Sequence, residues 1–253
     1  MFEPRLALAS LSGQSDAEWA KAAEEFAGAA FLGGIALDAP TREAARELVE
    51  RDREEFLPDD PARFVADQLA ALEDLDLRPG FNVRTTSLEP LREVAGICAD
   101  SGAILELNAH CRQDEMCAAG AGEALLRDPD RLREQVAAAA EEGPDVSVKV
   151  RAEVPGVDLA ETARVVADAG GDAMHVDAMD SEAVVAEVAS VAAETDLFVI
   201  ANNGVRDEAT VREYLACGAD AVSVGRPSDD STVLRRVRTA VDVWFAEKPE
   251  VRA

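Results

Sequence analysis

Strand-like apolar runs alternate with amphipathic segments along the chain, and this alternation limits the possible folds more than any other feature. The runs lie at residues 5–11, 29–38, 80–86, 103–109, 145–152, 172–178, 196–203 and 220–226. Segments with helical spacing lie between them, at 18–27, 61–75, 88–99, 129–141, 159–169, 182–194, 208–216 and 232–245. Eight strand–helix units predict one (β/α)8 TIM barrel, a single domain over residues 1–253. A doubly wound sheet is less favoured, since no Gly-x-Gly-x-x-Gly follows the first run.

Composition and the N-terminal sequence indicate where in the cell a protein with this fold is expected. No apolar run is long enough to cross a membrane, and the start, MFEPRLALAS, lacks the basic cluster of a signal peptide. We therefore expect a cytoplasmic protein with no membrane partner. In a reducing cytoplasm the four cysteines are expected to stay free thiols.

The charge is strongly negative, with 51 Asp and Glu against 25 Lys and Arg, a net charge of −26. The only lysines are Lys21, Lys149 and Lys248. Such a surface repels nucleic acid at ordinary salt, and it is typical of proteins that work in concentrated salt, where self-repulsion is screened. The retention of Lys149 in the middle of the chain therefore indicates a specific role.

Polar side chains gather at the predicted strand ends, where a TIM barrel carries its chemistry. These are Asn82, Asn108, His110, Cys111, Lys149, Arg151, His175, Asn202 and Arg226. Two strands end in glycine-containing turns that lead into helices, at 201–207 and 225–230. Backbone N–H groups at such turns, with Arg226 beside them, favour a phosphate site. The alternative is that Gly204 and Gly225 serve only the turns.

Five segments resemble the motifs of tRNA-dihydrouridine synthases, in the same order. They are LELNAHCRQDEMCAAGAGEALLRDP, VSVKVR, AMHVD, VIANNGV and GADAVSVGR, spread from Leu105 to Pro227. Together they are typical of flavin-dependent barrels that reduce or oxidise pyrimidines, a group that includes dihydroorotate dehydrogenases. With the acidic composition, the resemblance implies a short, halophile-type archaeal form.

The resemblance implies an FMN cofactor, with NADPH or NADH as reductant, and roles for individual residues. Lys149 and His175 would lie beside the flavin ring, and Asn82 would bond its polar edge. Asn202, Asn203, Gly204, Gly225 and Arg226 would hold the FMN phosphate. Asn108 and Arg151 would orient the uracil, and Cys111 would be the acid that exchanges a proton with C5.

The loop that contains Cys111 allows other interpretations. Cys111 and Cys117 are separated by five residues, which is neither a zinc-ribbon nor a redox Cys-x-x-Cys spacing, so we expect no metal site. Gly120 and Gly122 would allow a tight turn before the next helix. His110 stands where the family has Gly, and it is either a rival proton donor and substrate contact or a plain polar loop residue.

Other departures from the family pattern widen the choice of substrate. Val176-Asp177 stands where the family has Gly-Arg, which removes a basic contact. The family carries a helical C-terminal domain that grips tRNA, whereas only EKPEVRA follows the last predicted helix. The substrate is therefore either tRNA or a small pyrimidine. A cofactor-free phosphate-binding isomerase or lyase and a non-catalytic flavin-binding protein stay open as alternatives, and the oligomeric state is not predicted.

The net charge of −26 predicts that the fold needs salt. Screening should relieve self-repulsion in the compact state, because the Debye length falls to about 3 Å at 1 M salt. Melting curves recorded from dilute to multimolar potassium chloride should therefore show a rising midpoint. A midpoint that is flat or falls with salt would contradict this expectation.

Overall fold

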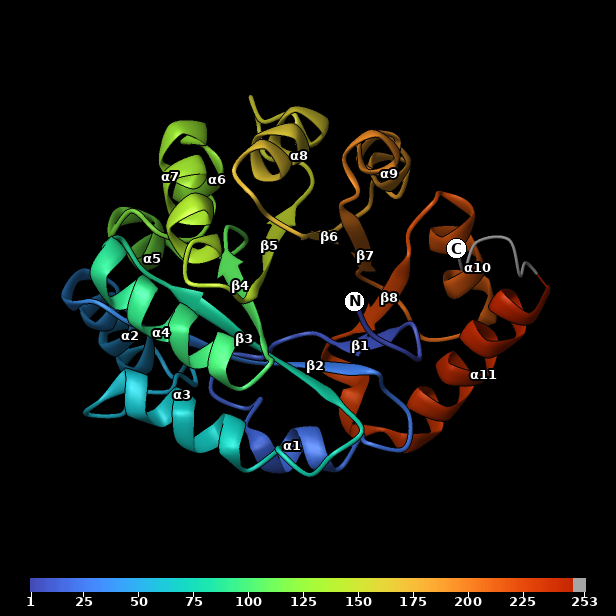
Figure 1. The fold of residues 1–253 in the computed structure, drawn as a ribbon, viewed down its shortest axis with the longest axis horizontal. Coiled ribbons are helices and arrows are strands. Elements are labelled where there is room, and N and C mark those ends of the chain that lie inside the picture. The colour runs from blue at the N-terminus through green and yellow to red at the C-terminus, as the bar shows by residue number, and fades with distance from the viewer. Residues whose placement is uncertain (248–253) are drawn as a thin grey trace.

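Eight parallel strands close into one barrel in the order β1-β2-β3-β4-β5-β6-β7-β8, with helices around the outside (Figure 1). The computed structural model describes residues 1–247, and β1 pairs with β8 to complete the ring. The predicted (β/α)8 TIM barrel is therefore confirmed. Residues 248–253 of the predicted domain lie outside the described part of the chain.

The elements follow one another as strand and helix. The strands are β1 (Leu6–Leu8), β2 (Ala29–Ala36), β3 (Arg78–Arg84), β4 (Ile104–Asn108), β5 (Asp145–Arg151), β6 (Ala173–Asp177), β7 (Phe198–Asn202) and β8 (Ala221–Val224). The helices are α1 (Ala17–Lys21), α2 (Ala39–Glu50), α3 (Pro61–Ala70), α4 (Leu88–Asp100), α5 (Asp114–Ala118), α6 (Glu123–Leu126), α7 (Pro129–Ala140), α8 (Leu159–Asp168), α9 (Ala183–Thr195), α10 (Glu208–Ala216) and α11 (Ser231–Glu247), with a 3-10 turn, η1 (Arg226–Asp229).

The sequence prediction was wrong in detail near the N-terminus. Strand β1 is shorter than predicted, and β3 begins and ends two residues earlier. Helix α1 ends at Lys21 rather than Ala27, because the following residues form turns, such as the one that Phe26 N–H closes on the Ala23 carbonyl. Helix α2 was not predicted. It buries mainly small residues, Thr41, Ala44, Ala45 and Leu48, so the helix is amphipathic but contains few large apolar side chains.

The barrel interior has an apolar end and a polar end. Residues that alternate along the strands point inward. At the amino ends of the strands they form a small apolar cluster of Phe2, Ala7, Ala29, Phe31, Ile104, Ile200 and Ala221. Towards the carboxyl ends the buried residues become polar, namely Asn82, Glu106, Ser147, Lys149, His175 and Ser223. The carboxyl ends of the strands, called the mouth below, therefore open onto a buried polar layer.

The residues of the larger apolar cluster lie on the strands and on the helices around them, and they seal the barrel wall. Register then sets which inward residues are neighbours. Lys149 on β5 pairs with Asn108 on β4 and with His175 on β6. None of the helices within residues 1–247 is long and apolar enough to cross a membrane.

Candidate functional site

A buried carboxylate, Glu106 on β4, is the centre of the polar layer. Its side chain is 0% exposed. Asn82 Nδ2 donates to Oε1 at 2.7 Å, while His175 Nδ1 and Ser147 Oγ lie 2.6 and 3.3 Å from Oε2. Burial alone would raise the pKa of this carboxyl, but His175, Lys149 and these hydrogen bonds hold it below its ordinary value. Glu106 is therefore an anion held by neighbours on three other strands.

Two chains of hydrogen bonds end at Glu106, and in each chain every side chain donates toward the carboxylate. Asn108 Nδ2 donates to Asn82 Oδ1 at 2.8 Å, and Asn82 Nδ2 in turn donates to Glu106 Oε1. On the other side, Asn202 Nδ2 donates to Ser223 Oγ at 2.7 Å. Ser223 Oγ lies 2.8 Å from His175 Nε2 but 3.5 Å from the Ala201 carbonyl oxygen. The Ser223 hydroxyl therefore donates its hydrogen bond to His175 Nε2.

This arrangement fixes the tautomer of His175. If Ser223 donates to Nε2, the ring proton is on Nδ1 and points at Glu106. Burial lowers the pKa of His175, and Lys149 adds to that effect, against the pull of Glu106. His175 is thus a neutral imidazole, 0% exposed, with both nitrogens engaged. The structure places it within the barrel, beneath the mouth rather than on its rim.

Lys149 is the unusual charge of the site. Its side chain is buried, yet within residues 1–247 its ammonium makes neither a hydrogen bond nor an ion pair. Burial lowers its pKa, whereas the carboxylates of Glu106 and Asp177 act in the opposite sense. Natural proteins rarely leave a buried ammonium without a partner, since the desolvation cost is high. An unpartnered ammonium at the mouth fits a ligand that brings its own acceptor.

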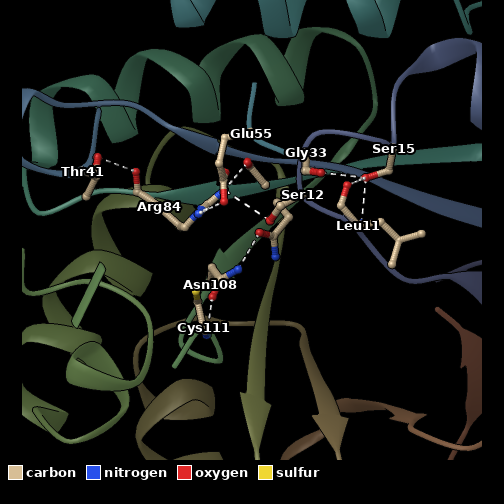
Figure 2. Close-up of polar contacts among 11 residues, drawn as sticks. Leu11, Ser12, Ser15, Gly33, Thr41, Glu55, Arg84, Asn108 and Cys111 are labelled. Atoms are coloured by element: carbon tan, nitrogen blue, oxygen red, sulfur yellow. Dashed lines mark hydrogen bonds and ion pairs between the residues drawn. The ribbon is translucent and has the colours of Figure 1, made fainter. Parts of the chain in front are cut away.

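Asn108 organises the loop that carries Cys111. Its Oδ1 accepts the N–H of Cys111 at 2.9 Å (Figure 2). The same oxygen accepts the N–H of His110 at 3.2 Å. Gly122 then packs on the Cys111 carbonyl, because a Cβ at Gly122 would lie 2.2 Å from that oxygen. Gly122 also has a φ of +60°, which favours glycine. The loop therefore holds Cys111 partly exposed at the mouth, as a free thiol.

His110 and Asp177 meet across the mouth. His110 Nε2 lies 2.6 Å from Asp177 Oδ2, although 66 residues separate the two in sequence. The second carboxylate oxygen, Oδ1, accepts the N–H of Met179 at 3.1 Å. Burial would raise the pKa of Asp177, but the hydrogen bond from His110 holds it below its ordinary value. The pair joins the loop after β4 to the end of β6.

Two arginines complete the rim. Arg151 Nη1 lies 3.1 Å from Glu123 Oε2, at the start of α6. Arg84 is 1% exposed and pairs with Glu55, while its Nη2 also reaches Ser12 Oγ and the Gly34 carbonyl (Figure 2). Arg84 thus connects the loop after β1, strand β2 and the segment between α2 and α3. Its Nε is buried without a hydrogen-bond partner.

The two glycine turns adjoin each other on neighbouring strands. Asn203 and Gly204, with φ of +95° and +66°, form the turn after β7. Gly225 begins η1 after β8, and Arg226 beside it is exposed. Apart from Gly225 and its two chain neighbours, no heavy atom of residues 1–247 lies within 4 Å of a Cβ built on Gly225, so there is open space beside this turn.

The side chains of Asn202 and Asn203 were expected to point toward the phosphate site, but both bind other parts of the protein. The Asn202 amide turns inward onto Ser223 rather than towards the turns, and Asn203 Nδ2 binds the Met179 carbonyl. Both amides are therefore held by the protein, and the turns keep the backbone of Gly204 and Gly225 and the Arg226 side chain for an anion.

Four contributors were missed at the level of sequence, namely Glu106, Asp177, Ser223 and Arg84. Glu106 stands two residues before Asn108, and Ser223 two before Gly225, so strand alternation points each of them inward with its neighbour. The two-residue alternation of side chains along a strand was therefore the sequence signal that could have revealed Glu106 and Ser223. No group of three or more His, Cys, Asp or Glu side chains within the described residues is placed to hold a metal ion.

The arrangement fits FMN, the cofactor that the motifs imply. A flavin offers carbonyl and ring-nitrogen acceptors for the unpartnered Lys149 ammonium, and a phosphate for the open turns at Gly204 and Gly225. A bound FMN would therefore supply partners for the Lys149 ammonium and for both turns.

Comparisons of sequence agree with the motifs. A family model described as dihydrouridine synthase matches residues 81–251. An uncharacterized protein of Methanocaldococcus jannaschii is 26% identical over 237 residues, which cover 89% of this chain and 89% of that protein.

Comparisons of structure find the barrel. A FabK variant from Thermotoga maritima has a TM-score of 0.56 at 16% identity over 88% of this chain and 61% of FabK, so the chain spans less than two thirds of that protein. A mandelate oxidase variant gives 0.61 at 16% identity over 96% of this chain and 74% of its own. A chain of the tryptophan synthase complex from Pyrococcus furiosus gives 0.58 at 15% over 97% and 100%. At these identities the likeness shows the fold alone.

Replacing Glu106 tests whether the polar layer depends on it. Glu106→Ala would leave Asn82, His175 and Ser147 without their buried acceptor and should lower the free energy of unfolding by about 3–5 kcal/mol. Glu106→Gln, which keeps the shape, should cost less. Urea unfolding in molar potassium chloride measures both, with the exposed Glu187→Ala of α9 as control. If Glu106→Ala and Glu187→Ala unfold alike, Glu106 does not organise the barrel interior.

Proposed function

Because the chain belongs to the dihydrouridine synthase family, we propose that it is an FMN-dependent oxidoreductase that reduces the C5–C6 double bond of a uracil ring. The proposed substrate is tRNA, and the proposed reductant is NADPH or NADH. The observation that carries the proposal is Lys149, a buried lysine at the mouth of the barrel whose ammonium has no hydrogen-bond or ion-pair partner within residues 1–247.

The residues proposed to hold FMN come from five strands. Lys149 would bond the polar edge of the flavin ring and stabilise negative charge there. His175 and Asn82 would form the layer beneath it, where Glu106 fixes both side chains. The Gly204 and Gly225 turns, with Asn202, Asn203 and Arg226 around them, would receive the phosphate. Asn202 would act by holding Ser223, and Arg226 by its exposed guanidinium.

Reduction of the double bond needs a hydride at one carbon and a proton at the next, and bound FMN would supply the hydride. Cys111 would donate the proton from Sγ to C5 and recover it from solvent. Asn108 would orient this thiol, since its carbonyl oxygen holds the loop N–H groups. Arg151 keeps Nη2 and Nε free of protein partners within the described residues, so it would bond a uracil carbonyl.

A small pyrimidine is the second candidate substrate. The net charge of −26 favours it, because an acidic surface repels RNA unless salt screens the charges. The chemistry at C5 and C6 is the same for both substrates, and the reaction product distinguishes them.

The cofactor assignment predicts one FMN per chain. Arg226→Ala should weaken FMN binding by removing a charge-assisted pair worth about 1.5–3 kcal/mol. Lys149→Met should alter the flavin spectrum as well as the affinity. Titration of flavin-free protein with FMN, followed by absorbance, measures both, and Arg164→Ala on the outer face of α8 is the control. A colourless protein that binds no FMN would remove the basis of the proposal.

The role of Cys111 predicts a separation of binding from chemistry. Cys111→Ala should keep FMN and still accept electrons from an external reductant. Its reduced flavin should be re-oxidised by the pyrimidine substrate about 10²–10⁴-fold more slowly, the usual contribution of general acid catalysis. Cys117→Ala, in helix α5 six residues further on, is the control and should be near normal. Single-turnover absorbance measures the rate. If His110→Ala is crippled while Cys111→Ala is near normal, His110 is the acid.

A further inference from the structure

Two departures from the family pattern touch each other in this chain. His110 stands where the resemblance places Gly, and Asp177 where it places Arg. In the fold the two side chains meet at 2.6 Å between His110 Nε2 and Asp177 Oδ2. They form one unit, which we call the His110–Asp177 dyad, and it faces the mouth beside Cys111.

The dyad has a defined proton arrangement. Asp177 is an acceptor, because its carboxyl pKa is held low and its Oδ1 already accepts from Met179 N–H. The proton between the two side chains therefore belongs to His110 Nε2. Burial lowers the pKa of His110, and the charge of Lys149 acts in the same sense against Asp177, which favours the neutral ring. A neutral ring with its proton on Nε2 has a lone pair on Nδ1.

Nδ1 of His110 is the part of the dyad that is open to a ligand. It has no hydrogen-bond partner within residues 1–247, and the side chain is 31% exposed. The backbone beneath it is fixed, since Asn108 Oδ1 accepts its N–H at 3.2 Å. The dyad therefore presents one oriented acceptor to whatever enters the mouth.

We propose that the His110–Asp177 dyad determines substrate specificity by accepting the N3–H of a uracil ring through His110 Nδ1. This inference rests on the proposed function. Uracil carries a donor at N3, whereas cytosine carries a lone pair there. An acceptor at this place bonds the imide edge of uracil and repels the corresponding edge of cytosine. Asp177 is a positioning residue, because it acts through His110.

The tautomers can be tested without substrate. The chain has only two histidines, so histidine labelled with nitrogen-15 gives two imidazoles in the spectrum. We expect opposite tautomers, with the proton on Nε2 in His110 and on Nδ1 in His175. His110→Gln assigns the signals by removing one set. Asp177→Ala should release His110 into a mixture of tautomers and leave His175 unchanged. A His110 ring with its proton on Nδ1 would overturn the proposal.

The recognition step can be tested on the flavin-loaded protein with uridine, cytidine and 3-methyluridine as probes. Uridine should shift the Nδ1 signal of His110, and 3-methyluridine, which lacks N3–H, should not. His110→Ala should lower the preference for uridine over cytidine by about tenfold or more, the loss of one hydrogen bond together with the repulsion of the wrong base. Arg112→Ala, an exposed neighbour in the same loop, should keep the preference.

The results of these experiments distinguish a failure of this inference from a failure of the proposed function. Uridine binding that leaves the Nδ1 signal unchanged, with the preference intact in His110→Ala, would overturn the role of the dyad and leave the flavin chemistry standing. If none of the three nucleosides binds to the flavin-loaded protein, the recognition proposal and a uracil substrate fail together.

Discussion

Glu106 carries a negative charge inside the barrel, where no part of its side chain meets solvent, and the polar layer is built around that charge. A buried carboxylate is costly unless donors surround it. Asn82, Ser147 and His175 are those donors, and Asn108, Ser223 and Asn202 form the next ring behind them. The positions of side chains from six strands therefore follow from one carboxylate. The apolar end of the barrel, below this layer, closes the other side of the interior.

The same charge accounts for the chemistry at the mouth. Lys149 is kept in the interior by the fields of Glu106 and Asp177, without a direct bond to either, so its ammonium is available to a ligand. Burial keeps His175 neutral under the mouth and His110 neutral on its rim, because it lowers both pKa values against the opposite effect of Glu106 and Asp177. The site thus combines the Lys149 ammonium, two oriented imidazoles and the Cys111 thiol. Such a set can bind a polar planar ring, orient a second one against it, and transfer a proton.

The sequence predicted the eight strands and most of the helices because the apolar runs are long and regular. It also placed Lys149, Asn108 and Cys111 towards the strand ends, where the structure has them, whereas His175 lies deeper, within the barrel. Helix α2 was missed because its buried face is made of small residues. Glu106 was missed because a carboxylate within a strand ordinarily faces water, and its inward direction depends on closure of the barrel. The contact of His110 with Asp177 joins two strand ends far apart in sequence, and no local pattern carries it.

The proposed reaction is the reduction of a uracil ring by a flavin bound in this barrel. The most direct measurement is mass spectrometry of the products formed when the reduced, flavin-loaded protein is mixed without oxygen with an unmodified tRNA transcript or with a free pyrimidine, in molar salt. The account predicts that the flavin is re-oxidised and that dihydrouridine, or the free dihydropyrimidine, appears in equal amount. A flavin that stays reduced in the presence of both substrates would contradict it.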